Sequence, residues 1–376
     1  MSHIYFDNSA TTPVCPAAAD RLREVMCHAY GNPSSLHQLG FEASRILEES
    51  RSVVAAAFGA DSSEVIFTGS GSESNNLALL GAALSKKRAG KRIVSSAIEH
   101  PSVTRTLTHL EAQGFEVVRL APDVHGNITK EQLFEAVNND TVLVSLALVN
   151  NELGSLLPVS DIAAAVKQSG SNALIHCDAV QAFGKMPLSV SALRVDLLSV
   201  SAHKAFGPKG VGALYIKKGI TLSPVLFGGS QERNLRPGTQ NLPAIAGFAA
   251  ALESLPPREQ ISLQLKALSA ALRQRLSAMD RVVFHSDTNA FPSIVNFSML
   301  GFKSEVLLHF LSQKGIFVSN GAACAKGKPS EILTACGIPA EQIQSALRVS
   351  FSYKNTLNEV FALCEALAEA QNTLRG

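Results

Sequence analysis

The chain has 376 residues, of which 46% are hydrophobic and 17% charged, and its formal net charge is +2. This composition supplies enough apolar material for two domains and excludes the polar bias of disordered chains. With a net charge near zero, the chain lacks the positive field of a general nucleic-acid binder. Tyrosine is scarce and tryptophan absent, so a surface for base stacking is also lacking, and we expect no direct nucleic-acid contact.

The start of the chain has no basic stretch followed by an apolar core, so no secretion signal is predicted. No apolar run is long enough to span a bilayer. Among the six cysteines there is no C-x-x-C pair and no zinc spacing, and no metal site is predicted. We therefore expect a cytoplasmic protein without membrane contact, whose cysteines are reduced thiols.

Short apolar runs alternate with longer amphipathic stretches along most of the chain. Strands are predicted over 65–67, 92–94, 117–120, 141–148, 173–175, 196–200 and 210–216, with helices over 72–84, 103–113 and 159–168 between them. This alternation predicts an α/β fold with a mostly parallel sheet covered on both faces. After Ser254 the pattern changes at Pro256-Pro257, and a long helix is predicted up to about Met279. We place a domain boundary near Leu255.

In such a sheet, ligands bind at the carboxyl ends of the strands. The first predicted strand is followed by 68–76, a run of small residues that leads into a helix, where free N–H groups favour a phosphate. No Gly-Lys-Ser/Thr follows, and Ser74 replaces the third glycine of a dinucleotide fingerprint. Taken alone, the segment is more typical of a helix cap.

Polar groups also follow the later strands. Glu99-His100-Pro101 follows the second strand and Asn150 to Gly154 follows the long one. A lone histidine is more often structural, and the second segment is typical of a polar turn. Asp178 ends a buried strand, where its carboxylate requires a cationic partner such as a protonated pyridine nitrogen. Lys204 follows the next strand, where a lysine can form an imine.

Asp178 and Lys204 together supply the pyridinium partner and the Schiff-base lysine of pyridoxal-phosphate (PLP) enzymes. With them, an ordered set of motifs resembles the class V aminotransferases of PLP fold type I, and within them the NifS/IscS-like cysteine desulfurases. The matching segments are 5–13, Asn32-Pro33-Ser34-Ser35, 150–154, Ser201-Ala202-His203-Lys204, Arg236-Pro237-Gly238-Thr239 and 348–351.

The resemblance implies a seven-stranded, mostly parallel sheet in a large PLP-binding domain over 16–255. A smaller C-terminal α+β domain, formed by 1–15 and 256–376, would carry the Cys324 loop. It also implies a homodimer with shared active sites, because the position of Thr239 reaches the phosphate of the partner subunit's cofactor in this family.

The resemblance further implies the role of each site residue. Lys204 binds PLP covalently, Asp178 holds the ring nitrogen, and His100 stacks on the ring and assists proton transfers. Gln181 donates to the phenolic oxygen, and Arg348 binds the substrate carboxylate. The remaining residues contact the phosphate, or in one case both cofactor and substrate: Gly71, Ser72, Ser201 and His203, and Asn151.

The reaction depends on Cys324, which lies in a small, polar and basic segment typical of an exposed loop. Lys326 and Lys328 favour its thiolate, and the motif match indicates a sulfur acceptor rather than an incidental surface thiol. The other cysteines are predicted to pack or to have no role: Cys15, Cys27, Cys177, Cys336 and Cys364.

The predicted activity is therefore conversion of L-cysteine to L-alanine, with sulfur held on Cys324 as a persulfide and passed to an acceptor protein. The link from Cys324 to Pro329 is shorter than in the family's long-loop members, and Ser352 replaces a usual glycine. The acceptor and its pathway, whether iron–sulfur clusters or tRNA or cofactor thiolation, stay open. The alternatives are a selenocysteine lyase or small-molecule aminotransferase of the same class, or a non-catalytic sulfur-transfer scaffold.

Overall fold

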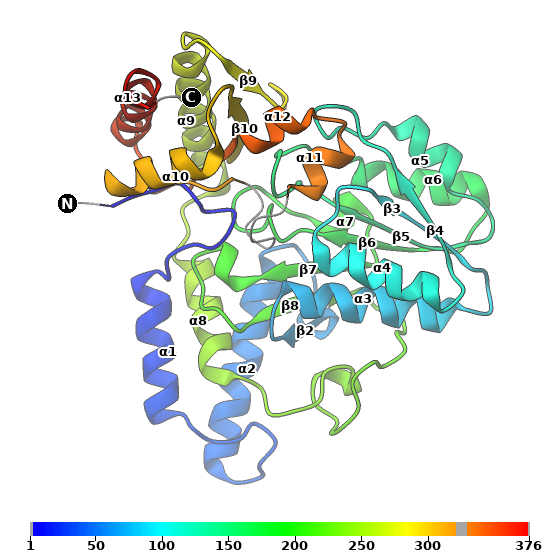
Figure 1. Cartoon of the computed structure of the whole chain (residues 1–376). Coiled ribbons are helices and arrows are strands. Elements are labelled where there is room, and N and C mark those ends of the chain that lie inside the picture. The colour runs from blue at the N-terminus through cyan, green and yellow to red at the C-terminus, as the bar shows by residue number, and fades with distance from the viewer. Residues whose placement is uncertain (1–2, 321–328, 375–376) are drawn as a thin grey trace.

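The computed structural model describes residues 3–320 and 329–374. Its centre is a seven-stranded sheet in the order β2-β8-β7-β6-β5-β3-β4 (Figure 1). Five strands, β3 to β7, are parallel, while β8 runs antiparallel to both of its neighbours. The strands are β2 (Val65–Thr68), β3 (Arg92–Ser96), β4 (Glu116–Leu120), β5 (Thr141–Ala147), β6 (Leu174–Asp178), β7 (Leu197–Ser201) and β8 (Gly212–Ile216).

The side chains of this sheet alternate between its two faces, as the period of a strand requires. Ile93 and Leu143 pack with Leu77 of α3 in one buried cluster. Their chain neighbours Val94 and Val144 belong to a second cluster. Every residue of β5 is buried, which explains why this strand is a continuous apolar run in the sequence rather than an alternating one.

Helices cover both faces. α3 and α4 contact each other on one face, while α2 and α8 pack together as part of the second cluster. The helices of the first 255 residues are α1 (Pro16–His28), α2 (Gln38–Ala56), α3 (Gly71–Lys86), α4 (Pro101–Ala112), α5 (Lys130–Ala136), α6 (Ile162–Ser169), α7 (Val190–Leu193) and α8 (Leu242–Glu253), with 3₁₀ turns η1 (Ser62–Glu64), η2 (Val159–Asp161), η3 (Ala202–Lys204) and η4 (Glu232–Asn234).

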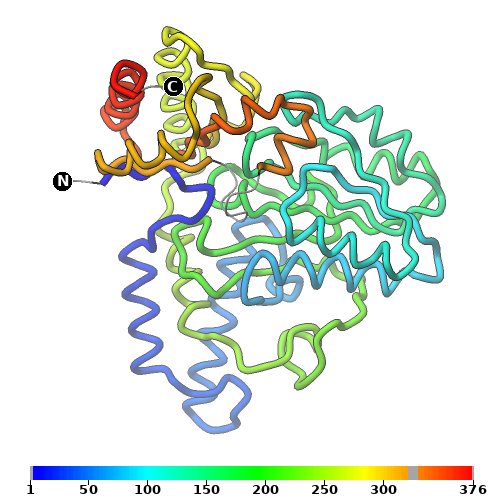
Figure 2. The backbone as a smooth tube through the Cα atoms, viewed as in Figure 1, coloured from blue at the N-terminus to red at the C-terminus, as the bar shows by residue number. Residues whose placement is uncertain are grey.

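The rest of the chain forms a smaller antiparallel sheet of order β12-β10-β9, above the large sheet in Figure 1. α9 and α13 pack against each other beside it. β1 (Ile4–Tyr5) pairs in parallel with β11 (Ile316–Phe317), so the N-terminal strand lies against the C-terminal part of the chain (Figure 2). The other elements are β9 (Val282–Phe284), β10 (Ile294–Met299), β12 (Ala346–Ser350), α9 (Arg258–Ser277), α10 (Ser304–Gln313), α11 (Glu331–Ala335), α12 (Ala340–Gln344) and α13 (Leu357–Thr373).

The predicted fold class is confirmed. Each of the seven predicted strands is present, with bounds that differ by a few residues, and the sheet is mostly parallel. The predicted helices over 72–84, 103–113 and 159–168 correspond to α3, to α4, and to η2 followed by α6. The division into domains near Leu255 stays a prediction. Within the part of the chain that the structure describes, no helix is long and apolar enough to cross a membrane.

Gly212, the first residue of β8, has no room for a side chain. A Cβ there would lie 2.7 Å from the carbonyl carbon of Ser70 and 2.8 Å from the carbonyl oxygen of Val200. These are backbone atoms, so they cannot move without displacing the loop that begins α3. We expect Gly212→Ala to lower the free energy of unfolding, measured in urea, by about 1–3 kcal/mol. In Gly229→Ala the new Cβ meets only the movable end of the Gln231 side chain. A loss as large in this control would contradict the steric explanation.

Candidate active site

A cavity of about 410 Å³ opens at the carboxyl ends of β5, β6 and β7. The N-terminal segment and β12 contribute further walls, so the cavity joins parts of the chain that are more than 300 residues apart. Ten of the predicted site residues line it: Gly71, Ser72, His100, Asn151, Asp178, Gln181, Ser201, His203, Lys204 and Arg348.

Lys204 is the last residue of η3, directly after β7. Its Nζ donates hydrogen bonds to the backbone carbonyls of Ser9 and Ala10, the second at 2.8 Å. The Ser9 carbonyl also accepts a hydrogen bond from Gln181 Nε2 at 3.0 Å. The N-terminal segment therefore contacts both the predicted Schiff-base lysine and its neighbouring glutamine.

Asp178 ends β6 and is 6% exposed. Its Oδ2 accepts a hydrogen bond from Asn75 Nδ2 on α3 at 2.7 Å, and its Oδ1 accepts one from the Val180 backbone N–H at 3.0 Å. Both donors are neutral, and a buried carboxylate among neutral donors is a good partner for a cationic ligand.

His100 caps the N-terminus of α4 and turns one edge of its ring toward the protein. Its Nδ1 accepts a hydrogen bond from the Ser102 backbone N–H at 3.1 Å and lies 2.8 Å from Ser102 Oγ. Asn75 Nδ2 donates to that hydroxyl and to Asp178. Burial lowers the pKa of His100, while Asp178 acts in the opposite direction and Lys204 in the same one. The imidazole is therefore favoured in its neutral form, with the proton on Nε2.

A second wall combines the start of α3 with β7. Gly71 is the first residue of α3, and a Cβ on it would lie 2.7 Å from Val180 Cγ2. Ser201 Oγ is buried and has no hydrogen-bond partner among the described residues. Burial, together with nearby Lys204, lowers the pKa of His203 to about 4, so this side chain is neutral at pH 7. The N–H groups at a helix N-terminus, next to a hydroxyl that has no hydrogen-bond partner in the described residues, are suited to bind a phosphate.

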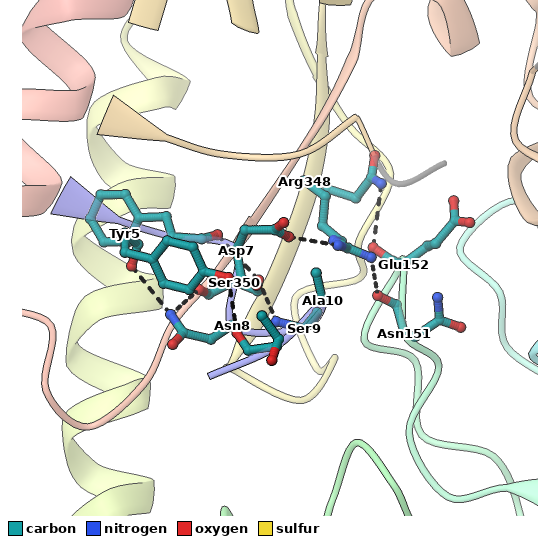
Figure 3. A network of polar contacts seen from close by, with 12 residues as sticks. Tyr5, Asp7, Asn8, Ser9, Ala10, Asn151, Glu152, Arg348 and Ser350 are labelled. Carbon is teal, nitrogen blue, oxygen red and sulfur yellow. Dashed lines mark hydrogen bonds and ion pairs between the residues drawn. The ribbon is translucent and has the colours of Figure 1, made fainter. Parts of the chain in front are cut away.

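Arg348, on β12, is 2% exposed and connects three segments (Figure 3). Its Nη2 forms an ion pair with Asp7 Oδ1 at 2.8 Å, and its Nη1 donates to the Asn151 carbonyl at 3.0 Å. Nε is buried and has no partner within the described residues. The guanidinium thus has a fixed orientation and retains an N–H group for a ligand carboxylate.

Two further predicted residues, Thr239 and Cys324, need separate description. Thr239 lies on the exposed surface, and its predicted contact concerns a partner subunit. Cys324, with Lys326 and Lys328, lies outside the described residues.

The other cysteines are the four buried thiols Cys15, Cys177, Cys336 and Cys364 and the exposed Cys27. Burial raises the pKa of Cys177, Cys336 and Cys364, in the second case to about 12. Thiols of this kind are poor nucleophiles, in agreement with the packing role predicted for them. No group of three or more potential metal ligands occurs within residues 3–320 and 329–374.

The sequence analysis did not single out two buried carboxyl groups of the cavity wall. Glu99 accepts hydrogen bonds from Ser96 Oγ at 2.5 Å and from the Ala147 N–H, and burial raises its pKa to about 8. Glu152 accepts a hydrogen bond from Ser330 Oγ at 2.6 Å, and burial raises its pKa to about 7. Both are adjacent to predicted site residues, but sequence alone does not show that they are buried.

Comparisons with known proteins give one consistent result. The family model "Aminotransferase class-V" matches residues 4–363. "Cysteine desulfurase IscS" of Methanosarcina thermophila is 39% identical over 376 residues, which cover 99% of this chain and 93% of the relative. A solved "NIFS-like protein" is similar with a TM-score of 0.92 and 35% identity, covering 99% and 100% of the two chains. "SspA in complex with cysteine" has a TM-score of 0.83 and 31% identity, covering 94% and 100%.

The stability of the fold is expected to depend on the ionisation of Glu152. Burial raises its pKa from 4.5 to about 7, so the folded chain holds this proton more tightly than the unfolded chain does. Ionisation therefore destabilises the fold as the pH rises through this window. Glu152→Gln keeps an oxygen for Ser330 but cannot ionise. Between about pH 5 and about pH 8, the wild type should therefore lose roughly 2–3 kcal/mol of unfolding free energy relative to Glu152→Gln.

The measurement is urea denaturation at a series of pH values. Glu341→Gln, which removes an exposed carboxylate from α12, is the control. A constant difference between Glu152→Gln and wild type over the whole pH range would show that the buried carboxyl group does not influence stability in this way.

Proposed function

The chain belongs to the class-V aminotransferase family and is a cysteine desulfurase of the IscS and NifS kind, and on that premise we propose that it binds pyridoxal 5′-phosphate through Lys204 and moves the sulfur of L-cysteine to Cys324. The observation that supports this proposal best is convergence. Ten residues from separate motifs line one cavity, although the sequence distributes them over nearly 280 positions.

The residues of the cavity fit the cofactor. The buried Ser201 hydroxyl has no partner in the described part of the chain, and the Gly71 N–H opens a helix of 16 residues. Both can donate to a phosphate, and Ser72 and His203 line the same wall. The carboxylate of Asp178 is buried and contacted by neutral donors, which suits a protonated pyridine nitrogen.

When bound, the cofactor supplies an electron sink for bonds at the substrate's α-carbon. The protein groups position the reactants and move protons. Lys204 holds the cofactor and then serves as the base for the α proton. His100 would stack on the ring and would present its Nε2 proton, because its Nδ1 is occupied by Ser102. Gln181 would donate to the phenolic oxygen, and Asn151 would contact cofactor and substrate; both line the cavity.

Arg348 is the proposed site for the substrate carboxylate. A carboxylate in the cavity can accept from the buried guanidinium, whose Nε has no other described partner. The solved relative "SspA in complex with cysteine" gives a cysteine ligand in the same fold. Asp7 and the Asn151 carbonyl hold the guanidinium in place, so little side-chain order is lost when the substrate binds.

Cys324 is the proposed sulfur acceptor, on the strength of the family motif and the basic residues that follow it. Its thiolate Sγ forms a bond with the substrate sulfur while the bond between that sulfur and Cβ breaks, and the electron pair of the broken bond stays with the carbon skeleton. Cβ then takes up one proton and Cα regains the proton that Lys204 removed, which completes L-alanine. The remaining thiols are less suited to this role, because four of them are buried. The resulting persulfide then passes its outer sulfur to an acceptor protein.

The proposal includes a homodimer, with Thr239 close to the cofactor phosphate of the partner subunit. Thr239 is exposed in the single chain, which leaves it accessible to a second copy. The acceptor protein, and its use of the sulfur for iron–sulfur clusters or thiolation, is left open by the residues described here. A cytoplasmic location stays a prediction from the sequence.

The central test is product formation from L-cysteine by cofactor-loaded protein under a reducing thiol. We expect a yellow enzyme that releases sulfide and alanine in equal amounts. Cys324→Ala should keep the cofactor colour and lose at least about 99% of sulfide release, because the group that accepts the sulfur is missing. Cys27→Ala removes an exposed thiol elsewhere and should behave as wild type.

Other results of this test would favour another member of the family. Full activity of Cys324→Ala would remove Cys324 from the mechanism. Activity with selenocysteine but not with cysteine would indicate a selenocysteine lyase. A yellow protein that is inactive on both amino acids, but exchanges amino groups with keto acids, would indicate an aminotransferase.

Arg348→Lys provides a separate test of substrate binding. Lysine keeps the positive charge but cannot contact Asp7, the Asn151 carbonyl and a substrate carboxylate with one planar fork. We expect KM for L-cysteine to rise about 10- to 100-fold, with the absorbance of the bound cofactor unchanged. Lys354→Arg is the control, because Lys354 follows the 348–351 motif closely in sequence but does not line the cavity. An unchanged KM in Arg348→Lys would place the substrate carboxylate elsewhere.

A further inference from the structure

Lys185 is a buried lysine that the proposed mechanism does not use. It is 5% exposed, follows Gln181 by four residues, and donates from Nζ to Gln181 Oε1 at 3.3 Å. Burial, together with the nearby cations Lys204 and Arg348, lowers its pKa to about 7. Burial of an amine costs free energy, and the hydrogen bond to Gln181 offsets part of this cost.

The two hydrogen bonds of Gln181 determine which way its amide points. The lysine amine donates, so it must face the amide oxygen. The Ser9 backbone carbonyl only accepts, so it must face the amide nitrogen, which lies 3.0 Å away. Both partners favour the same orientation, and after a flip the amide oxygen would face the Ser9 carbonyl, which leaves two acceptors without a donor between them.

Gln181 lines the cavity, but Lys185 is not among the residues that do. Any effect of Lys185 on a ligand is therefore transmitted through Gln181 or by charge. With Oε1 engaged by Lys185, the group that Gln181 offers to the cavity is the second N–H of Nε2.

We propose that Lys185 is a positioning residue that fixes the orientation of the Gln181 amide, so that the phenolic oxygen of the cofactor meets an N–H donor and not the amide oxygen. The inference rests on the proposed function, in which Gln181 contacts this oxygen. A donor there stabilises the anionic oxygen and thus the unprotonated form of the bond between Lys204 and the cofactor.

The test is a pH titration of the visible absorbance of cofactor-loaded protein without substrate, since the protonated and unprotonated forms differ in colour. Lys185→Met keeps the size of the side chain but removes the donor. We expect its midpoint to rise by about one pH unit, and that of Gln181→Leu to rise by at least as much. In the double variant, the lysine substitution should add nothing. Lys185→Arg retains a donor and should titrate near wild type.

Each outcome separates the two proposals. An unchanged midpoint in Lys185→Met beside a shifted one in Gln181→Leu overturns the role of Lys185 and leaves the proposed function intact. Additive shifts in the double variant show that Lys185 acts by charge, which also overturns it. An unchanged midpoint in yellow Gln181→Leu removes Gln181 from the proposed site. Lys185→Ala, whose smaller side chain cannot clash, carries the same expectation should Lys185→Met fail to fold.

Discussion

The buried guanidinium of Arg348 is the interaction on which the geometry of the cavity depends. A buried cation must be paired, and this one is paired by Asp7 from the N-terminal segment and by the carbonyl of Asn151 after β5. The backbone of Arg348 also pairs with Ser319, at the start of the segment that leads to Cys324. One side chain thus joins the small sheet to the large one, and its Nε–H, which has no partner among the described residues, is available for the carboxylate that is proposed to bind. On the proposed function, stability and substrate recognition would use the same ion pair.

The carbonyl of Ser9 has a comparable role beside Lys204. It accepts from Lys204 and from Gln181, and Gln181 is in turn held by Lys185. The N-terminal segment is therefore part of the site as well as the partner of β11. This arrangement explains why its sequence is rich in small polar residues. Backbone carbonyls can approach two buried donors only where side chains leave room, and the short side chains of Ser9 and Ala10 do so.

Much of this could be predicted from the sequence, and the rest has a physical reason for being missed. The alternation of short apolar runs with amphipathic stretches predicts the sheet. β5 is such a run, and it is continuously apolar because both of its faces are buried. The proximity of Asp178 and Lys204 was predictable, because residues that follow consecutive parallel strands lie at the same edge of the sheet. Glu99, Glu152 and Lys185 were not, since the roles of these residues arise from burial, and an isolated charged residue in a sequence is normally exposed. The orientation of β8 is set by the short connection after η3, which periodicity does not report.

The three missed residues share one physical effect, because burial favours the neutral form of both acids and bases. It raises the pKa of Glu99 and Glu152 to about 8 and about 7, and lowers that of Lys185 to about 7. His100 and His203 shift downward for the same reason. The wall around the cavity therefore carries less charge near pH 7 than its composition suggests. A charged ligand would then interact chiefly with the groups that contact it. On the proposed function, the hydrogen-bond direction fixed at Gln181 and His100 would be the means by which the site distinguishes one protonation state of the ligand from another.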